Sequence, residues 1–333
     1  MIVTPMRPGL AGAAGLMMIG LSLPAADAAP AFDAPADVGA ITAMETDLAT
    51  QTSMKGLIGD YAPDATVVDI YAPGLYKGHD QINQAFERQF APLRTLKHHM
   101  DDINIASDGT FACAAMRISF DFTLKNGTSG AMSLRQIDAF KKIDGVWKII
   151  QQHIAVPIDG KTGSAVMDGT LPARGPIAWA ANPLTGPAVS PDQAEAEIRR
   201  WMEVGALSTS IDQLMRYYGP GDDLLVYDAF YPGEIRGRAE LRRYYASIMG
   251  SYNSIEVKMP VFAADSDGSF GVQIDTQDMR LKMKDGSTKY ISLRQSDCMR
   301  RIDGKWYSFF EMISFPVVAQ TGKAIMENPA AFR

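Results

Sequence analysis

The chain has 333 residues, a length that predicts about two domains of ordinary size. Hydrophobic residues make up 47% and charged residues 21% of it, as in globular proteins, which argues against a largely disordered chain. The formal net charge is −6 and no run of Lys and Arg occurs, so a nucleic-acid partner is not expected. The two cysteines, Cys113 and Cys298, exclude a disulfide-rich scaffold and a four-thiolate zinc site, and leave open whether they pair with each other.

The first 28 residues have the features of a cleaved export signal. Arg7 supplies a short positive region, residues 10–23 form an apolar run without charge, and Ala26 and Ala28 are small residues suited to signal peptidase. The apolar run is too short to span a bilayer comfortably, and no second long apolar segment follows it. We therefore expect an exported, periplasmic protein, cleaved near Ala28, with no integral membrane segment afterwards. A disordered N-terminal tail is the alternative interpretation.

An internal repeat organises the rest of the chain. Several motifs recur 159 positions later: Ser133–Gln136 (SLRQ) at Ser292–Gln295, Trp147 at Trp306, and Asp69 at Asp228. Such a repeat predicts a duplicated domain, with copies at residues 38–167 and 192–327. Residues 168–191 between them are rich in Pro, Gly and Ala and are typical of an extended linker.

In chain order, each copy begins with helices and continues with strands. In the first copy the patterns predict helices at 41–59 and 80–90, and strands at 65–70, 98–105, 110–124, 132–143 and 147–156. In the second copy they predict a first helix within residues 192–215. Helices followed by a meander of strands imply an α+β fold, with the helices packed against a strongly curved, mostly antiparallel sheet.

Three segments resemble motifs of the SnoaL-like and ketosteroid-isomerase-like branch of the nuclear transport factor 2-like superfamily. Tyr61–Asp69 (YAPDATVVD) resembles its "YADDATVxD" segment, and Gly78–Phe86 resembles its "G-x-x-x-I-x-x-x-F" segment. Leu134–Trp147 resembles "R-x-T-D-x-x-x-x-x-D-G-x-W". The resemblance implies two tandem cone-shaped domains, each with a deep apolar pocket. Because such folds host isomerases, dehydratases, cyclases, lyases and binding domains, the fold leaves the activity open.

Two carboxylates fall at positions that matter in this family. Asp69 stands where ketosteroid isomerases place their general base, and an apolar pocket raises the basicity of such a carboxylate. Asp138 lies near the position of their second, protonated aspartate. The first predicted helix, 41–59, contains no match for their oxyanion tyrosine, which argues against steroid isomerisation. The structural alternatives are that Asp69 caps the turn at residues 73–74 and that Asp138 serves only the fold.

All four histidines lie in the first copy. His98 precedes its hairpin turn by the same interval as the catalytic histidine of the dehydratase-like branch. His153 shares a predicted inward strand face with Trp147, Ile149 and Gln151. A neutral imidazole can accept and return a proton near pH 7, so both histidines are candidates for catalysis. The alternative is that these rings are simply packed in the core or exposed.

The remaining candidates are side chains expected to contact a substrate. They are Tyr71, Tyr76, His99, Gln136, Asp138, Trp147 and Gln151. We expect no metal and no cofactor, because the adjacent His98 and His99 point to opposite faces of a strand and no HExxH, phosphate-binding loop or GxSxG motif occurs.

Together these features predict a cofactor-independent acid/base lyase or isomerase acting on an apolar, aromatic small molecule. Asp69 or His98 would remove a proton, and His153, Tyr71 or Tyr76 would stabilise or reprotonate the product oxygen. The resemblance implies dehydration or retro-aldol deformylation, including that of lignin-derived diaryl compounds. Nine of the twelve tyrosines lie in the second copy, which we expect to serve as a scaffold, and family members pair as homodimers, so a homo-oligomer is also expected. The alternative is a non-catalytic periplasmic small-molecule binding protein.

Overall fold

The computed structural model describes residues 35–51, 53–168, 174–177 and 189–333. The predicted export signal and most of the predicted linker lie outside these residues. Within the described part of the chain, none of the helices combines the length and the apolar character needed to cross a membrane.

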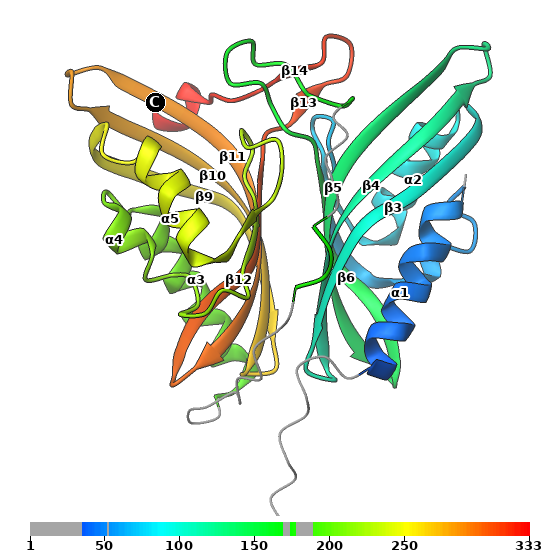
Figure 1. The fold of residues 1–333 in the computed structure, drawn as a ribbon, viewed down its shortest axis with the longest axis horizontal. Helices are drawn as coiled ribbons and strands as arrows, with labels where there is room; N and C mark the ends of the chain where they lie inside the picture. Colours follow the sequence, from blue (N-terminus) through cyan, green and yellow to red (C-terminus); the bar gives the residue numbers. More distant parts are fainter. Residues whose placement is uncertain (1–34, 52, 169–173, 178–188) are drawn as a thin grey trace, which may run out of the picture.

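The first domain is a six-stranded sheet with helices on one side of it (Figure 1). Its helices are α1 (Pro35–Thr50), the 3₁₀ turn η1 (Ile58–Asp60) and α2 (Gly78–Phe90). Its strands are β1 (Tyr61–Val68), β2 (Leu75–Lys77), β3 (Leu93–Ser107), β4 (Phe111–Leu124), β5 (Ser129–Ile143) and β6 (Val146–Ala155). The strand order is β2-β1-β6-β5-β4-β3, and β1 and β6 form the parallel pair in an otherwise antiparallel sheet.

The second domain repeats this plan in the order β8-β7-β12-β11-β10-β9, again with one parallel pair, β7 and β12. Its helices are α3 (Pro191–Ala206), α4 (Ile211–Leu214) and α5 (Gly237–Ile248). Its strands are β7 (Leu225–Tyr227), β8 (Ile235–Arg236), β9 (Tyr252–Ser266), β10 (Phe270–Met283), β11 (Thr288–Ile302) and β12 (Lys305–Ser314). A small hairpin, β13 (Val317–Val318) and β14 (Lys323–Ala324), and the 3₁₀ turn η2 (Pro329–Phe332) end the chain. The molecule is therefore a tandem duplication.

Local sequence explains where the helices begin and end. Ser190 caps α3, since its side chain accepts a hydrogen bond from the N–H of Gln193, and Pro191 occupies the first turn. The helix expected over residues 192–215 is in fact two helices. Ser210 accepts a hydrogen bond from the N–H of Gln213 and so starts α4 as a separate element.

The two sheets face each other in the middle of the molecule, with the helices on their outer sides (Figure 1). The sheets are mixed and twisted, and they lack the strong curvature that we expected. Their back-to-back contact accounts for this, because the inner face of each sheet packs against that of the other. A shared apolar cluster fills the contact and contains Phe111 and Ile137 of the first domain and Phe270 and Phe310 of the second.

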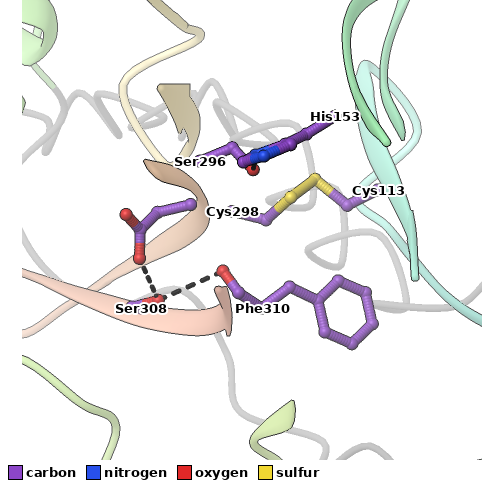
Figure 2. The surroundings of a disulfide bond; sticks show 7 residues. Cys113, His153, Ser296, Cys298, Ser308 and Phe310 are labelled. Carbon is purple, nitrogen blue, oxygen red and sulfur yellow. Dashed lines mark hydrogen bonds between the residues drawn. A yellow bond between two sulfur atoms is a disulfide. The ribbon is translucent and has the colours of Figure 1, made fainter. Parts of the chain in front are cut away.

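A disulfide between Cys113 and Cys298 crosses this interface (Figure 2). It joins β4 of the first domain to β11 of the second, between residues that are 185 positions apart in the sequence and whose Cα atoms are 6.5 Å apart. His153 and Ser296 lie beside it, again one from each domain. The two domains are thus covalently fixed through the centre of their interface.

Candidate functional site

The first domain encloses a cavity of about 480 Å³ between α1, α2 and the sheet. Its walls are mainly aliphatic and aromatic, with Phe86, Phe90, Phe120 and Phe122 among them. A small set of polar side chains also reaches it: Glu45, Gln51, Tyr61, Asp69, Tyr71, Gln89, His98, Gln136 and Gln152. A mostly apolar cavity of this size with a few convergent polar groups is typical of a small-molecule site.

Asp69 follows the end of β1 and lies in the cavity wall with 2% of its surface exposed. The Nε2 of Gln89 on α2 donates a hydrogen bond of 2.7 Å to its carboxylate. Burial raises the pKa of Asp69, and this effect outweighs the hydrogen bonds and the charge of Arg294 that favour the ionised form. Asp69 is therefore a stronger base than an aspartate in water.

His98 lies on β3, opposite Phe120 of β4, and reaches the same cavity. Burial and the neighbouring His99 lower the pKa of its imidazole. The raised pKa of Asp69 and the lowered pKa of His98 bring the proton affinities of the two groups closer together. Groups with similar proton affinities are suited to passing a proton in both directions.

A buried carboxylate organises the polar floor of the cavity, which consists of Gln136, Gln152 and Tyr61. Asp138 accepts hydrogen bonds from the side-chain amides of Gln136 (2.7 Å) and Gln152 (3.1 Å). Tyr61 in turn donates to the Oε1 of Gln152 at 3.0 Å. Gln136, Gln152 and Tyr61 line the cavity, whereas Asp138 lies behind them and is fully buried. Asp138 therefore orients the polar floor.

Glu45 on α1 adds a second buried carboxyl group to this part of the cavity. Its side chain is 1% exposed, and burial together with the nearby Asp138 raises its pKa well above the ordinary value. Burial also raises the pKa of Asp138, to about 6. Because two buried carboxylates close together resist ionising at the same time, this pair retains a proton to a higher pH than an ordinary carboxyl group does.

A β-bulge at Ile150 changes the direction of the side chains that follow it on β6. Ile149 pairs with Phe140 and Gln151 pairs with Ala139, so Ile150 is an extra residue without its own partner on β5. Gln152 therefore faces the cavity, and the prediction that Gln151 does so is wrong. Gln151 instead donates to the main-chain oxygen of Ala263 in the second domain.

The same bulge turns His153 away from the cavity. Its Nδ1 lies 2.9 Å from the Oγ of Ser296, and its Nε2 lies 2.7 Å from the Oγ of Ser314, both in the second domain. The ring is completely buried, and burial together with Arg294 and Arg135 lowers its pKa well below the ordinary value. The prediction of His153 as a catalytic residue of the cavity is thus corrected: it is an interface residue.

Three other predicted residues also lie outside the cavity lining. Trp147 packs in the core and its indole N–H donates to the carboxylate of Asp37 at 3.3 Å. Tyr76 lies on the edge strand β2, and His99 is exposed because it points to the opposite face from His98. The cavity thus brings together Asp69, His98, Tyr71 and Gln136 from the predicted set, with Asp138 directly behind them.

The sequence interpretation missed Glu45, Tyr61, Gln89 and Gln152. Glu45 has a recognisable signal: it stands among Ile41, Met44 and Leu48 on the apolar stripe of a predicted helix. A carboxylate on such a stripe is either paired or functional. Gln152 could not be found by strict alternation, because its orientation depends on the bulge. Within the described ranges, no group of three His, Cys, Asp or Glu side chains is arranged to hold a metal ion.

The second domain has a cavity of its own, of about 590 Å³. Aromatic side chains dominate its lining: Trp201, Tyr217, Tyr218, Phe230, Tyr244, Tyr245, Tyr252 and Phe315. Tyr244 donates to Asp228 at 2.5 Å, and Tyr218 donates to Glu311 at 2.9 Å. Burial raises the pKa of Glu311 well above its ordinary value. The second domain, which we expected to serve as a scaffold, thus also has a cavity lined by buried acidic and phenolic groups.

The profile of the SnoaL-like domain matches residues 40–159 and 195–318, one segment in each domain. The chain belongs to the SnoaL-like family. Its two SnoaL-like segments coincide with the two sheets, in agreement with the resemblance seen in the sequence. No curated protein matches this SnoaL-like chain.

Solved structures similar to this SnoaL-like protein match it over about one domain. One is a nuclear transport factor 2-like protein of unknown function from Pseudomonas putida KT2440, with 18% identity, a TM-score of 0.38, and coverage of 41% of this chain and 99% of its own. Another is a nuclear transport factor 2-like superfamily protein from Salmonella enterica serovar Typhimurium LT2, with 18% identity, a TM-score of 0.34, and coverage of 39% of this chain and 96% of its own. A third is a candidate scytalone dehydratase from Novosphingobium aromaticivorans DSM 12444, with 22% identity, a TM-score of 0.33, and coverage of 44% of this chain and 96% of its own.

Proposed function

We propose that the first domain is a cofactor-independent acid/base lyase or isomerase that acts on an apolar, aromatic small molecule. One observation carries this proposal: an apolar cavity of about 480 Å³ is lined by two buried carboxyl groups, Asp69 and Glu45, and burial raises the pKa of both, that of Glu45 well above its ordinary value. Two groups of different proton affinity in one apolar cavity can serve as the base and the acid of a proton-transfer reaction.

In a dehydration, Asp69 accepts the proton of a C–H bond next to the leaving group. The electron pair of that bond forms the double bond as the C–O bond breaks. The leaving hydroxyl takes a proton from Glu45 and departs as water. Asp69 then returns its proton to the donor, directly or through solvent, and both groups regain their starting states.

In a retro-aldol deformylation, Asp69 accepts the proton of a hydroxymethyl O–H group. The C–C bond breaks and formaldehyde leaves, while a carbonyl group of the substrate next to that carbon takes up the electron pair as an enolate. The enolate carbon then takes a proton from Glu45, and Asp69 returns its proton to Glu45 through solvent. Both reactions need only proton transfers inside an apolar cavity. The phenylalanines in its wall favour aromatic substrates, and lignin-derived diaryl compounds are the class to test first.

We also propose that the protein works in the periplasm after removal of residues 1–28. The disulfide between Cys113 and Cys298 supports this location, because disulfides form and persist mainly in oxidising compartments.

The experiment uses the mature chain, residues 29–333, with a panel of phenolic diaryl compounds. Mass spectrometry follows the loss of water or formaldehyde in the wild type, Asp69→Asn and Glu45→Gln. Asp228→Asn is the matched control, because it makes the same change in the second domain. We expect turnover that falls in both first-domain variants. Tight binding without turnover, equal in all four proteins, would instead identify a small-molecule binding protein.

A further inference from the structure

A buried arginine crosses from each domain to the other. Arg294 on β11 is 3% exposed, and its Nη1 donates to the main-chain oxygen of Asp69 at 2.5 Å in the first domain. Arg135 on β5 makes the reciprocal contact, at 2.9 Å, to the main-chain oxygen of Asp228. The arginines and the aspartates are both related by the repeat. Each domain therefore holds the segment that carries the aspartate of the other.

The segment held by Arg294 is a tight turn. The N–H of Asp69 donates to the oxygen of Gly74 at 2.7 Å and closes it. Gly74 has a φ of 65°, and a Cβ atom built there would lie 2.5 Å from the Nη1 of Arg294 and 2.6 Å from the oxygen of Asp69. Only glycine leaves space for the guanidinium at this point. The turn is thus shaped to receive Arg294.

The second domain holds this turn from a second side. The N–H of Val317 on β13 donates to the oxygen of Ile70 at 2.9 Å, and the N–H of Ala72 donates to the oxygen of Val317 at 3.0 Å. Ala319, which follows β13, even lines the first cavity. In exchange, Gly160 of the first domain lines the second cavity. Figure 1 shows these two segments, in red and green, meeting above the sheets. The first cavity is therefore incomplete without the second domain.

Arg294 also provides a fixed charge beside Asp69. Burial lowers the pKa of this arginine to about 10, so it stays protonated at neutral pH, and its charge lowers the pKa of Asp69. The charge of Asp69 also acts on Tyr71 and Tyr76, and burial raises the pKa of both, so they are uncharged at neutral pH. The next cation, Arg88, acts on Tyr76.

We propose that Arg294 is a positioning residue of the first cavity, which holds the main chain of the Asp69 turn and supplies a positive charge that favours the ionised form of Asp69. This inference rests on the proposed role of Asp69 as the base. If so, the second domain contributes to the first site through the side chain of Arg294.

The test compares Arg294→Met, Arg294→Lys and Arg135→Met in the mature protein. Arg135→Met is the matched control, since it removes a similarly buried interdomain arginine on the opposite side of the pseudo-symmetric interface. Carbon-13 NMR of protein labelled at the aspartate carboxyl carbon gives the titration midpoint of Asp69. The signal that disappears in Asp69→Asn assigns it. Circular dichroism and thermal unfolding verify that each variant is folded. If Arg294→Met does not fold, the comparison is made with Arg294→Lys.

We expect Arg294→Met to raise the titration midpoint of Asp69 by about one pH unit or more, because a nearby opposite charge is lost. Arg294→Lys should raise it less, and Arg135→Met should leave it in place. An unchanged midpoint in Arg294→Met, or equal shifts in Arg294→Met and Arg135→Met, would overturn the proposal. If a substrate is turned over, the acidic limb of the kcat/KM profile should move with the midpoint. Absence of turnover would contradict the proposed function. It would not affect the test of Arg294, because the NMR titration of Asp69 needs no substrate.

Discussion

The two cavities share one fold and one aspartate position, yet they differ in what surrounds the carboxylate. Asp228 in the second domain accepts hydrogen bonds from the hydroxyl groups of Tyr244 and Tyr245. At the matching positions in the first domain the sequence has Ala85 and Phe86, which have no hydroxyl group.

Asp69 consequently has one side-chain hydrogen-bond donor, Gln89, among the described residues. A carboxylate with unused lone pairs in an apolar cavity can accept a proton from a substrate, whereas one held by two tyrosines is already satisfied. After the duplication, the aspartate thus stayed at the same position in both domains, while the side chains around it came to differ. This contrast supports the proposal of acid/base chemistry in the first cavity.

The largest expected effect on kcat/KM distinguishes two single variants, in which Asp69 or Asp228 is replaced by asparagine. Asp69→Asn should lower kcat/KM by about 10²- to 10⁴-fold, because a general base contributes about that much. Asp228→Asn should change it far less. Kinetics on the best substrate of the panel measure both. A larger loss in Asp228→Asn would reverse the assignment of the two cavities.

Breaking the covalent link between the domains should cost stability. Replacing Cys113 and Cys298 by serine removes a cross-link across 185 residues of sequence, which is worth about 2–5 kcal/mol in the free energy of unfolding. Urea unfolding of the mature protein, with and without the two substitutions, measures this loss. Equal stability of the two proteins would mean that the packed interface alone holds the domains together.

His153 should make the interface sensitive to acid. Its pKa is lowered in the folded state, so the unfolded chain binds a proton that the folded one does not. The free energy of unfolding should therefore fall as the pH drops below about 6.5, by at most about 1.4 kcal/mol per pH unit. His153→Gln should weaken this dependence between pH 7 and pH 5, while the exposed His99→Gln should retain it. Identical profiles for all three proteins would contradict the effect.

Asp108 should act in the opposite direction. Burial and the facing Asp267 raise its pKa to about 7, although main-chain N–H groups of Thr110 and Phe111 favour its ionised form. The folded state thus keeps a proton that the unfolded chain loses from about pH 4 upward. The free energy of unfolding should decline as the pH rises towards 7, and Asp108→Asn should remove that decline. Unfolding curves at pH 5 and pH 8 test it; an unchanged difference in the variant would refute it.

Much of the fold was accessible from the sequence, because the repeat, the turn motifs and the alternating patterns all point to the same elements. Asp69 and His98 were found by position in the motifs, and both reach the cavity. The misplacement of His153 and Gln151 has one cause, the extra residue Ile150 in β6, which inverts the alternation from that point on. A bulge depends on pairing between strands and has no clear local signal.

The sequence alone does not predict which residues of the two domains contact each other. The pairing of Cys113 with Cys298 was left open, because spacing alone does not show which residues the interface brings together. Arg135 and Arg294 point away from their own cavities and acquire their role only from the opposite domain. The expectation of strongly curved sheets failed for the same reason, since each sheet packs against the other.

The central claim is that Asp69 moves a proton of the substrate within the first cavity. The most direct measurement is deuterium incorporation into phenolic diaryl compounds in D₂O, followed by mass spectrometry in the wild type, Asp69→Asn and Asp228→Asn. For deformylation, the account predicts a deuterium label in the product with the wild type and Asp228→Asn, and none above background with Asp69→Asn. For dehydration, which places no solvent hydrogen on carbon, it predicts loss of water with the same two proteins and none above background with Asp69→Asn. Equal labelling by Asp69→Asn and the wild type, or loss of labelling in Asp228→Asn alone, would contradict it.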